Sequence, residues 1–133
     1  MELIRVATVE SPLTDRAAAP KQGDEGAPEA TIVFEVGFVP ALDGIAAGDE
    51  LLVLTWLDRA RRDVLRVRPR DDASRAEQGV FATRSADRPN PVGLHRVTVL
   101  EIDGRRMRVS ALEALDGTPV VDVKPALGSV GER

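Results

Sequence analysis

Short apolar, β-branched runs alternate with polar turns along the chain, a pattern typical of β-strands rather than helices. The predicted strands are Glu2–Val9, Ala30–Val39, Glu50–Leu57, a strand beginning at Val64, Gly79–Thr83, Val92–Ile102, Met107–Leu115 and Thr118–Val123. The run Glu50–Leu57 is almost wholly apolar, which favours a strand that is buried on both faces. Two Asp-Gly pairs, Asp103-Gly104 and Asp116-Gly117, predict tight turns between strands.

Signals for helices are few. The connector Pro40–Asp49 offers at most one helical turn, and Leu13–Ala30 is a long loop with two prolines and two glycines. Loops of that length are usually functional or disordered. The pattern therefore predicts a compact, mainly β single domain over residues 1–127, with seven or eight strands and no long helix. Residues 128–133 are predicted to be a frayed tail. The strand pattern by itself leaves a sandwich and a barrel open.

Composition removes several classes of site. A chain of 133 residues is one domain of ordinary size. It has no cysteine, so disulfides and thiolate chemistry are excluded, and its single histidine excludes any site built on two or more histidines. We expect no metal. No stretch approaches the roughly 18 apolar residues of a membrane span, and the N-terminus shows no secretory signal. We therefore expect a cytoplasmic protein with no membrane segment.

The formal net charge is −4, which is unusual for a protein that binds nucleic acid. The charge is unevenly placed, because residues 1–58 carry 3 basic and 11 acidic side chains, whereas residues 59–133 carry 15 and 11. Six arginines cluster within twelve positions: Arg59, Arg61, Arg62, Arg66, Arg68 and Arg70. Such a cluster can hold phosphates, or it can be a solvated surface.

The segment Gly79–Leu94, here called the proline loop, reads GVFATRSADRPNPVGL. Pro89 and Pro91 fix their own φ angles and restrict the residues before them, so the loop loses little entropy on binding a ligand. Asn90 stands between these prolines with both a donor and an acceptor. Arg84 and Arg88 can each grip a carboxylate or phosphate with two hydrogen bonds. The alternative is a rigid loop that closes one end of a barrel.

The proline loop, with GVFATRS followed by RPNPVGL, resembles the signature of the TsaA-like family of tRNA threonylcarbamoyladenosine methyltransferases. A second block, Leu115–Pro125, is similar to the family's DGTPVxDIKPY segment. Two weaker blocks, Ile4–Pro12 and Ala19–Gln22, resemble its opening strand and the segment that follows. The blocks run in family order from Ile4 to Pro125.

The resemblance implies a compact β-barrel that works as a homodimer and uses S-adenosylmethionine. The implied reaction transfers a methyl group to the exocyclic amine of threonylcarbamoyladenosine beside the anticodon of tRNA. The chain has no G-x-G-x-x-G segment, which agrees with a cofactor site that is not Rossmann-like.

Carried over by position, the resemblance implies a cofactor site with Arg84 facing the cofactor carboxylate and backbone groups fixing the adenosine. The implied cofactor residues are Pro20, Lys21, Gln22, Asp58, Arg84, Leu94, Leu115, Asp116, Gly117 and Thr118. Asn90 is the candidate for orienting the acceptor amine. The candidates for holding the acceptor are Arg59, Arg61, Arg62 and Arg88. Asp116 has the alternative role of a turn former, and Asp122 and Lys124 are expected to pair structurally.

Three features depart from the family pattern. Asp58 stands where the family often has histidine, His95 stands where it usually has a small polar residue, and the chain ends soon after Pro125. We expect His95 to be a strand residue at the barrel rim. Two alternatives therefore stay open beside the tRNA enzyme: a methyltransferase of the same fold that acts on a small molecule, and a non-enzymatic module that binds S-adenosylmethionine.

Overall fold

The computed structural model describes residues 1–14, 26–68 and 76–128. Within these residues the chain is mainly β, as predicted. The strands are β1 Ala7–Glu10, β2 Ala30–Phe34, β3 Glu50–Trp56, β4 Arg66–Val67, β5 Gln78–Gly79, β6 Val92–Asp103, β7 Arg106–Val109 and β8 Pro119–Pro125. Two short 3-10 helices, η3 Val36–Leu42 and η5 Val80–Ala82, are the only helical segments among the described residues. Neither of these helices is long or apolar enough to cross a membrane.

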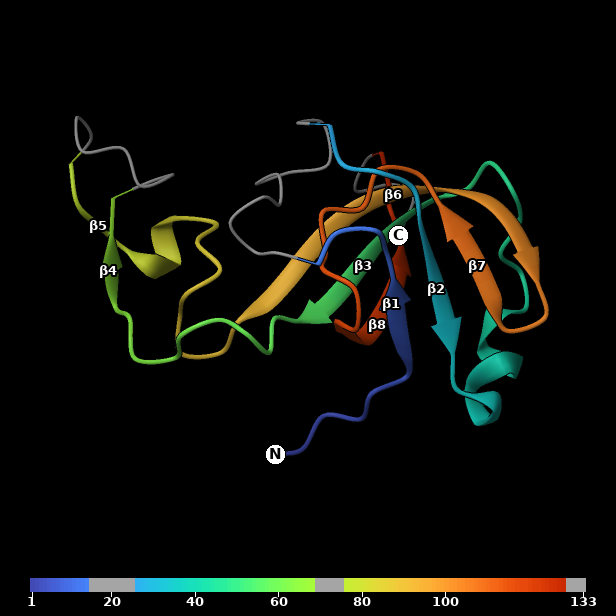
Figure 1. Ribbon diagram of the computed structural model, residues 1–133, viewed down its shortest axis with the longest axis horizontal. Helices are drawn as coiled ribbons and strands as arrows, with labels where there is room; N and C mark the ends of the chain where they lie inside the picture. The colour runs from blue at the N-terminus through green and yellow to red at the C-terminus, as the bar shows by residue number, and fades with distance from the viewer. Residues whose placement is uncertain (15–25, 69–75, 129–133) are drawn as a thin grey trace.

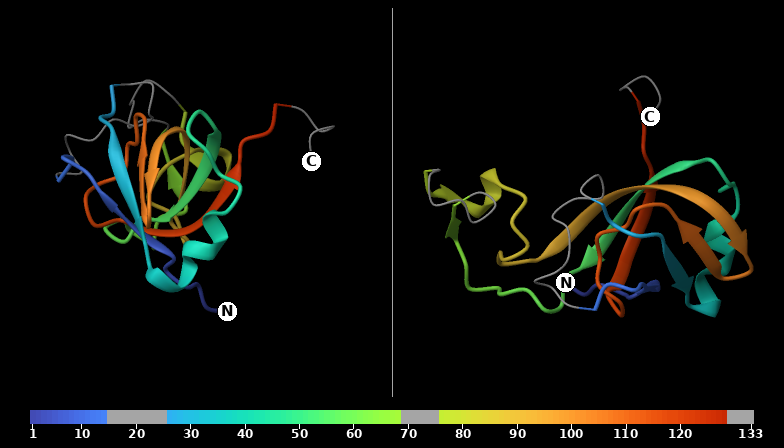
Figure 2. Two further views of the ribbon diagram at one scale, coloured as in Figure 1. Left: turned by 90° about the vertical axis from the view of Figure 1, so that its right-hand side faces the viewer. Right: turned by 45° about the horizontal axis from the view of Figure 1, so that its top comes forward.

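Six strands form a closed barrel in the order β1-β2-β7-β6-β3-β8, and all neighbouring strands are antiparallel. The pairing of Ala7 on β1 with Val120 on β8 closes the ring. Figure 2 shows the barrel end-on in its left view. The longest ladder joins β3 to β6 and runs from Glu50 opposite Thr98 to Trp56 opposite Val92.

Alternate residues of the barrel strands point inward and build the core. On β3 the side chains of Leu51, Val53 and Thr55 are buried, whereas Leu52 and Leu54 between them are half-buried. The prediction that this run is buried on both faces is therefore wrong, because one face of β3 lines the barrel and the other is only partly covered. The interior is filled by aliphatic side chains such as Ile32, Val53, Val99, Met107 and Val109.

Residues 57–68 and 76–91, here called the arm, leave the barrel between β3 and β6. Their two strands form a separate two-stranded sheet in which Arg66 pairs with Gly79. In Figure 1 this sheet and η5 project to the left, away from the barrel. The predicted strand Gly79–Thr83 is wrong beyond Gly79. The backbone and hydroxyl of Thr83 both bond to the carbonyl of Val80, so the chain turns into η5 instead of pairing onward.

Other boundaries moved as well. The strand predicted from Glu2 begins only at Ala7, and the strand predicted to reach Val39 ends at Phe34 because η3 follows. The strand predicted to reach Leu115 ends at Val109, where the chain turns to bond Leu112 N–H to the carbonyl of Pro28. Most of the predicted loop Leu13–Ala30 lies outside the described residues.

Both Asp-Gly turns are confirmed. Asp103 pairs with Arg106 across the β6–β7 hairpin, and Gly104 takes a φ of +60° in the turn between them. Gly117 takes a φ of +85° just before β8. A left-handed backbone of this kind favours glycine, which explains the choice of residue at both turns.

Candidate site at the base of the arm

Arg88 organises the proline loop from within. Its Nε donates to the carbonyl of Ser85 at 2.7 Å, and its Nη2 donates to the carbonyls of Val80, at 2.8 Å, and Thr83. Three backbone carbonyls of one loop are therefore satisfied by one half-buried guanidinium. The predicted part of Arg88 in acceptor binding stays a prediction, but the contacts present assign its side chain to holding the loop.

Arg62 holds the tip of the same loop. Its Nε donates to the carbonyl of Pro89 at 2.7 Å, and its Nη2 donates to Asn90 Oδ1 at 2.9 Å. The guanidinium also lies over the ring of Trp56, 5.1 Å from the ring centroid. Because the oxygen of the Asn90 amide already accepts from Arg62, the free polar group of this exposed side chain is its NH₂, a double donor.

Backbone contacts join the two sides of the arm. Arg61 N–H donates to Asp87 Oδ1 at 2.8 Å, and Arg88 N–H donates to the carbonyl of Arg61 at 3.0 Å. The Arg61 side chain forms two hydrogen bonds to Asp63, of 3.0 and 3.1 Å, which together with the arginine's charge lower the pKa of Asp63. Arg59 donates to the carbonyl of Thr14 at 3.1 Å. Several arginines of the cluster thus form hydrogen bonds within the chain, and Arg59 and Arg62 join segments that are far apart in sequence.

Arg84 differs from its neighbours. It is exposed, and within residues 1–14, 26–68 and 76–128 its side chain makes no hydrogen bond or ion pair. An exposed guanidinium on a loop that other arginines hold in place is available to a carboxylate without first breaking a contact. This observation fits the carboxylate that the resemblance implies at Arg84.

The other cofactor candidates lie at the barrel. Leu94 points outward from β6 and is 43% exposed. In the turn before β8, Asp116 accepts a hydrogen bond from Ser11 N–H at 3.0 Å, and Gly117 N–H donates to the carbonyl of Val9 at 2.8 Å. Asp116 therefore acts as a turn-holding residue with one carboxylate oxygen still open.

The remaining candidates are less defined. Leu115 is half-buried, and Thr118, directly before β8, is buried. Asp58 is exposed in the turn after β3. Pro20, Lys21 and Gln22 lie outside the described residues. The structure thus brings Leu94 and the Leu115–Thr118 turn to the barrel wall, whereas Arg84 lies on the arm.

Sequence analysis missed a buried polar chain of Thr55, His95 and Glu113. His95 Nε2 lies 2.6 Å from Thr55 Oγ1, and His95 Nδ1 lies 2.6 Å from Glu113 Oε1. His95 is a strand residue, as predicted, but its side chain is buried. One sequence signal for the burial of His95 was available. Side chains of a strand alternate between its two faces, so His95, two residues after Gly93, lies on the same inward face of β6.

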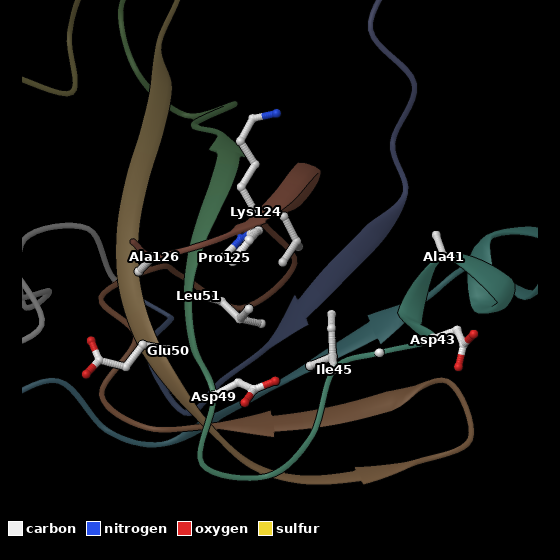
Figure 3. A pocket seen from close by; sticks show the side chains of 11 residues that line it. Ala41, Asp43, Ile45, Asp49, Glu50, Leu51, Lys124, Pro125 and Ala126 are labelled. Carbon is white, nitrogen blue, oxygen red and sulfur yellow. The ribbon is translucent and has the colours of Figure 1, made fainter. Parts of the chain in front are cut away.

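A surface pocket lies elsewhere on the barrel. It is about 550 Å³ in volume and is lined by the η3–β3 connection and by β3 and β8 (Figure 3). Lys124, at its edge, pairs with Asp122 at 3.0 Å, which confirms the pairing predicted for these two residues. The pocket includes none of the predicted site residues. Among the described residues no group of three or more acidic or histidine side chains is placed to hold a metal.

The fold and the proline loop define the class of this chain: a small antiparallel β-barrel whose inserted arm carries a loop locked by arginines. A family model for the tRNA-methyltransferase O N-terminal domain matches residues 8–130. The chain belongs to this family, and the resemblance read from its motifs is confirmed.

Curated relatives agree. A probable S-adenosyl-L-methionine-binding protein of Methanothermobacter thermautotrophicus is 46% identical over 90% of this chain and 85% of its own length. A protein of the same description from Archaeoglobus fulgidus is 46% identical over 98% of this chain, which spans only 36% of that relative. The tRNA (adenine(37)-N6)-methyltransferase of Escherichia coli is 32% identical over 92% of this chain and 56% of its own length.

Solved structures give the same result. The crystal structure of TrmO from Pseudomonas aeruginosa superposes with a TM-score of 0.77 at 27% identity, covering all of this chain and 60% of that protein. This chain therefore corresponds to little more than half of TrmO and of the Escherichia coli enzyme.

Proposed function

We propose that this chain is an S-adenosylmethionine-dependent methyltransferase that methylates the exocyclic amine of threonylcarbamoyladenosine beside the anticodon of tRNA. The observation that carries the proposal is the arginine-locked proline loop, which leaves Arg84 exposed and uncommitted. Family membership and the 32% identity to the Escherichia coli tRNA enzyme support it. A tRNA substrate places the protein in the cytoplasm.

The proposed roles of the residues follow from the family resemblance and agree with their positions in the structure. Arg84 would hold the carboxylate of S-adenosylmethionine, while Leu94 and the Leu115–Thr118 turn would hold its adenosine part. The bound sulfonium supplies an electrophilic methyl group. Asn90, with its oxygen held by Arg62, would direct its NH₂ donors at an acceptor oxygen or nitrogen of the modified base. That contact orients the amine for in-line attack, and the amine proton leaves to solvent.

A homodimer is part of the proposal. The arm projects from the barrel in Figures 1 and 2, and two of its large apolar side chains, Phe81 and Leu65, are 84% and 66% exposed. Apolar groups so exposed on a projecting element favour burial against a partner. A second copy would also supply a barrel wall to each arm, so that Arg84 of one chain can face the Leu94 surface of another.

A second candidate is a methyltransferase or binding module with another ligand in place of tRNA. The archaeal relatives at 46% identity are named only for S-adenosyl-L-methionine binding, which favours keeping this candidate. The salt dependence of acceptor binding separates the two. Affinity for tRNA falls steeply as salt rises, because phosphate contacts release counterions, whereas affinity for a small neutral acceptor changes little.

The test is methyl transfer from labelled S-adenosylmethionine to tRNA that carries threonylcarbamoyladenosine, with the same tRNA lacking that modification as control. The proposal predicts label in the modified tRNA only, located at the nucleoside beside the anticodon. Label in neither tRNA, in a preparation that binds the cofactor, would contradict the tRNA assignment. Substituting Arg62 is a poor test of tRNA contact, because its side chain holds the proline loop.

A further inference from the structure

The polar chain Thr55–His95–Glu113 joins three parts of the barrel end from which the arm emerges. Thr55 is the last inward-facing residue of β3, His95 lies near the start of β6, and Glu113 lies in the connection between β7 and β8. Both links are 2.6 Å long. The side chains of His95 and Glu113 are only 5% and 11% exposed, and Thr55 is fully buried. Water therefore screens these contacts little.

Gly93 makes the arrangement possible. It pairs directly with Thr55 across the β3–β6 ladder. A Cβ at position 93 would lie 2.3 Å from Thr55 Oγ1 and 2.7 Å from His95 Nε2. Only glycine leaves the space in which the hydroxyl and the imidazole meet, so the glycine of the proline loop serves this buried contact.

The cluster is costly for a core. Glu113 Oε2 is buried and has no hydrogen-bond partner. A buried polar atom in that state is destabilising, and an aliphatic side chain would fill the same place without this loss. Departures from such packing rules concentrate at functional sites.

The order hydroxyl, imidazole, carboxylate matches that of hydrolase triads. A nucleophilic role does not fit here, because Thr55 has no exposed surface and no substrate carbonyl can reach its oxygen. The cluster must therefore act through the segments that it joins.

We propose that His95 and Glu113 form a clamp that positions the cofactor site, an inference that rests on the function proposed above. His95 directly follows Leu94, and Glu113 lies two residues before the Leu115–Thr118 turn. The bond between them fixes the distance from β6 to this turn. His95 Nδ1 and Glu113 Oε1 lie 2.6 Å apart, so one hydrogen bond joins the ring to the carboxyl group. His95 and Glu113 are thus positioning residues, and neither needs to touch the cofactor.

Two substitutions at one position separate the halves of the cluster. In His95→Asn, the amide nitrogen takes the place of Nδ1 and keeps the bond to Glu113. In His95→Gln, it takes the place of Nε2, keeps the bond to Thr55 and leaves Glu113 without a donor. Calorimetric titration of S-adenosylmethionine into both variants and the unchanged protein is the first readout. Hydrogen exchange at the Asp116 and Gly117 amides is the second, with the amides of β7, which pairs with β2 and β6, as internal control.

The clamp predicts that His95→Gln weakens cofactor binding by about tenfold, which corresponds to about 1.4 kcal/mol, whereas His95→Asn stays close to the unchanged protein. Exchange at Asp116 and Gly117 is expected to accelerate in His95→Gln alone.

Equal affinities and equal exchange in the two variants would overturn the clamp. If the unchanged protein does not bind the cofactor, the proposed function fails, and the exchange comparison still decides the clamp. If either variant unfolds, Glu113→Gln replaces that variant. It keeps an acceptor for Nδ1 but no charge, so its cofactor affinity is expected to lie between the affinities predicted for His95→Asn and His95→Gln.

Discussion

The barrel and the arm are stabilised by different interactions. In the barrel, backbone ladders join six strands and alternate aliphatic side chains fill the interior. In the arm, the two strands have two residues each, and the chain is held by side chains that bond to backbone carbonyls, above all Arg62 and Arg88. Figure 1 shows how far the second region projects from the first.

The difference indicates that the barrel and the arm have different roles. A hydrophobic core is insensitive to small changes at its surface, so the barrel is a scaffold that keeps Leu94 and the Leu115–Thr118 turn in place. A loop held by directional hydrogen bonds has a defined shape without a core of its own. It can therefore present Arg84 and Asn90 to a ligand at little further cost in entropy.

The largest effect is expected from truncation in the barrel. Ile32→Ala removes a fully buried side chain from β2 and should lower the free energy of unfolding by about 2–5 kcal/mol. Urea denaturation measures this loss. Val33→Ala, on the half-buried outer face of the same strand, is the matched control and should cost much less. Equal losses in both variants would mean that the barrel interior is not the source of stability.

A smaller and more local effect is expected from the arm. Arg62→Ala removes two hydrogen bonds and the contact with Trp56, so the Arg88 amide should exchange about tenfold faster, as expected for a loss of about 1.4 kcal/mol. The urea midpoint of the barrel should barely move. Arg62→Lys keeps the charge but not the two-pronged geometry, and it should resemble the alanine variant. A large fall in barrel stability would remove the distinction between the two regions.

The smallest effect concerns the pair Arg61–Asp63. The pKa of Asp63 is lowered in the folded chain by the hydrogen bonds and the charge of Arg61. Its contribution to stability is therefore fully present above the ordinary aspartate pKa of about 3.9. It is lost as the pH falls through the lowered pKa of Asp63. Both side chains are exposed, so salt should weaken the effect.

Thermal melts of the unchanged protein and Asp63→Asn at pH 7 and pH 3, in low salt, measure this contribution. A small difference at pH 7 that shrinks at pH 3 is expected. A difference that grows on acidification would contradict the assigned sign.

The barrel strands were largely predictable from sequence, because alternation in β6 and the glycines of the two Asp-Gly turns are local signals. The arm was not. Gly79–Thr83 has the composition of a strand, yet Thr83 bonds back to Val80, and Val36–Val39 continues a β-rich run but turns into η3. In both places a local hydrogen bond competes with strand pairing, and composition does not reveal which one forms.

The motifs locate a candidate site in the sequence, whereas the contacts that shape this site appear only in the structure. The resemblance implies a role for Arg84, and the two flanking prolines single out Asn90; both roles stay predictions. No sequence signal showed that Arg62 and Arg88 hold the loop. His95 and Glu113 are 18 positions apart, and their contact depends on the barrel closing around Gly93. Contacts of that kind follow from the tertiary fold alone.

The most direct test of the central claim is calorimetric titration of S-adenosylmethionine into the protein and into Arg84→Ala. Arg108→Ala, an exposed arginine on β7 that pairs with Glu29, serves as the matched control. We expect binding that is preserved in Arg108→Ala and weakened by at least about tenfold in Arg84→Ala, since a charged hydrogen bond contributes about 1.5–3 kcal/mol. Absence of binding in the unchanged protein, or equal binding in all three, would contradict the assignment of the proline loop to the cofactor.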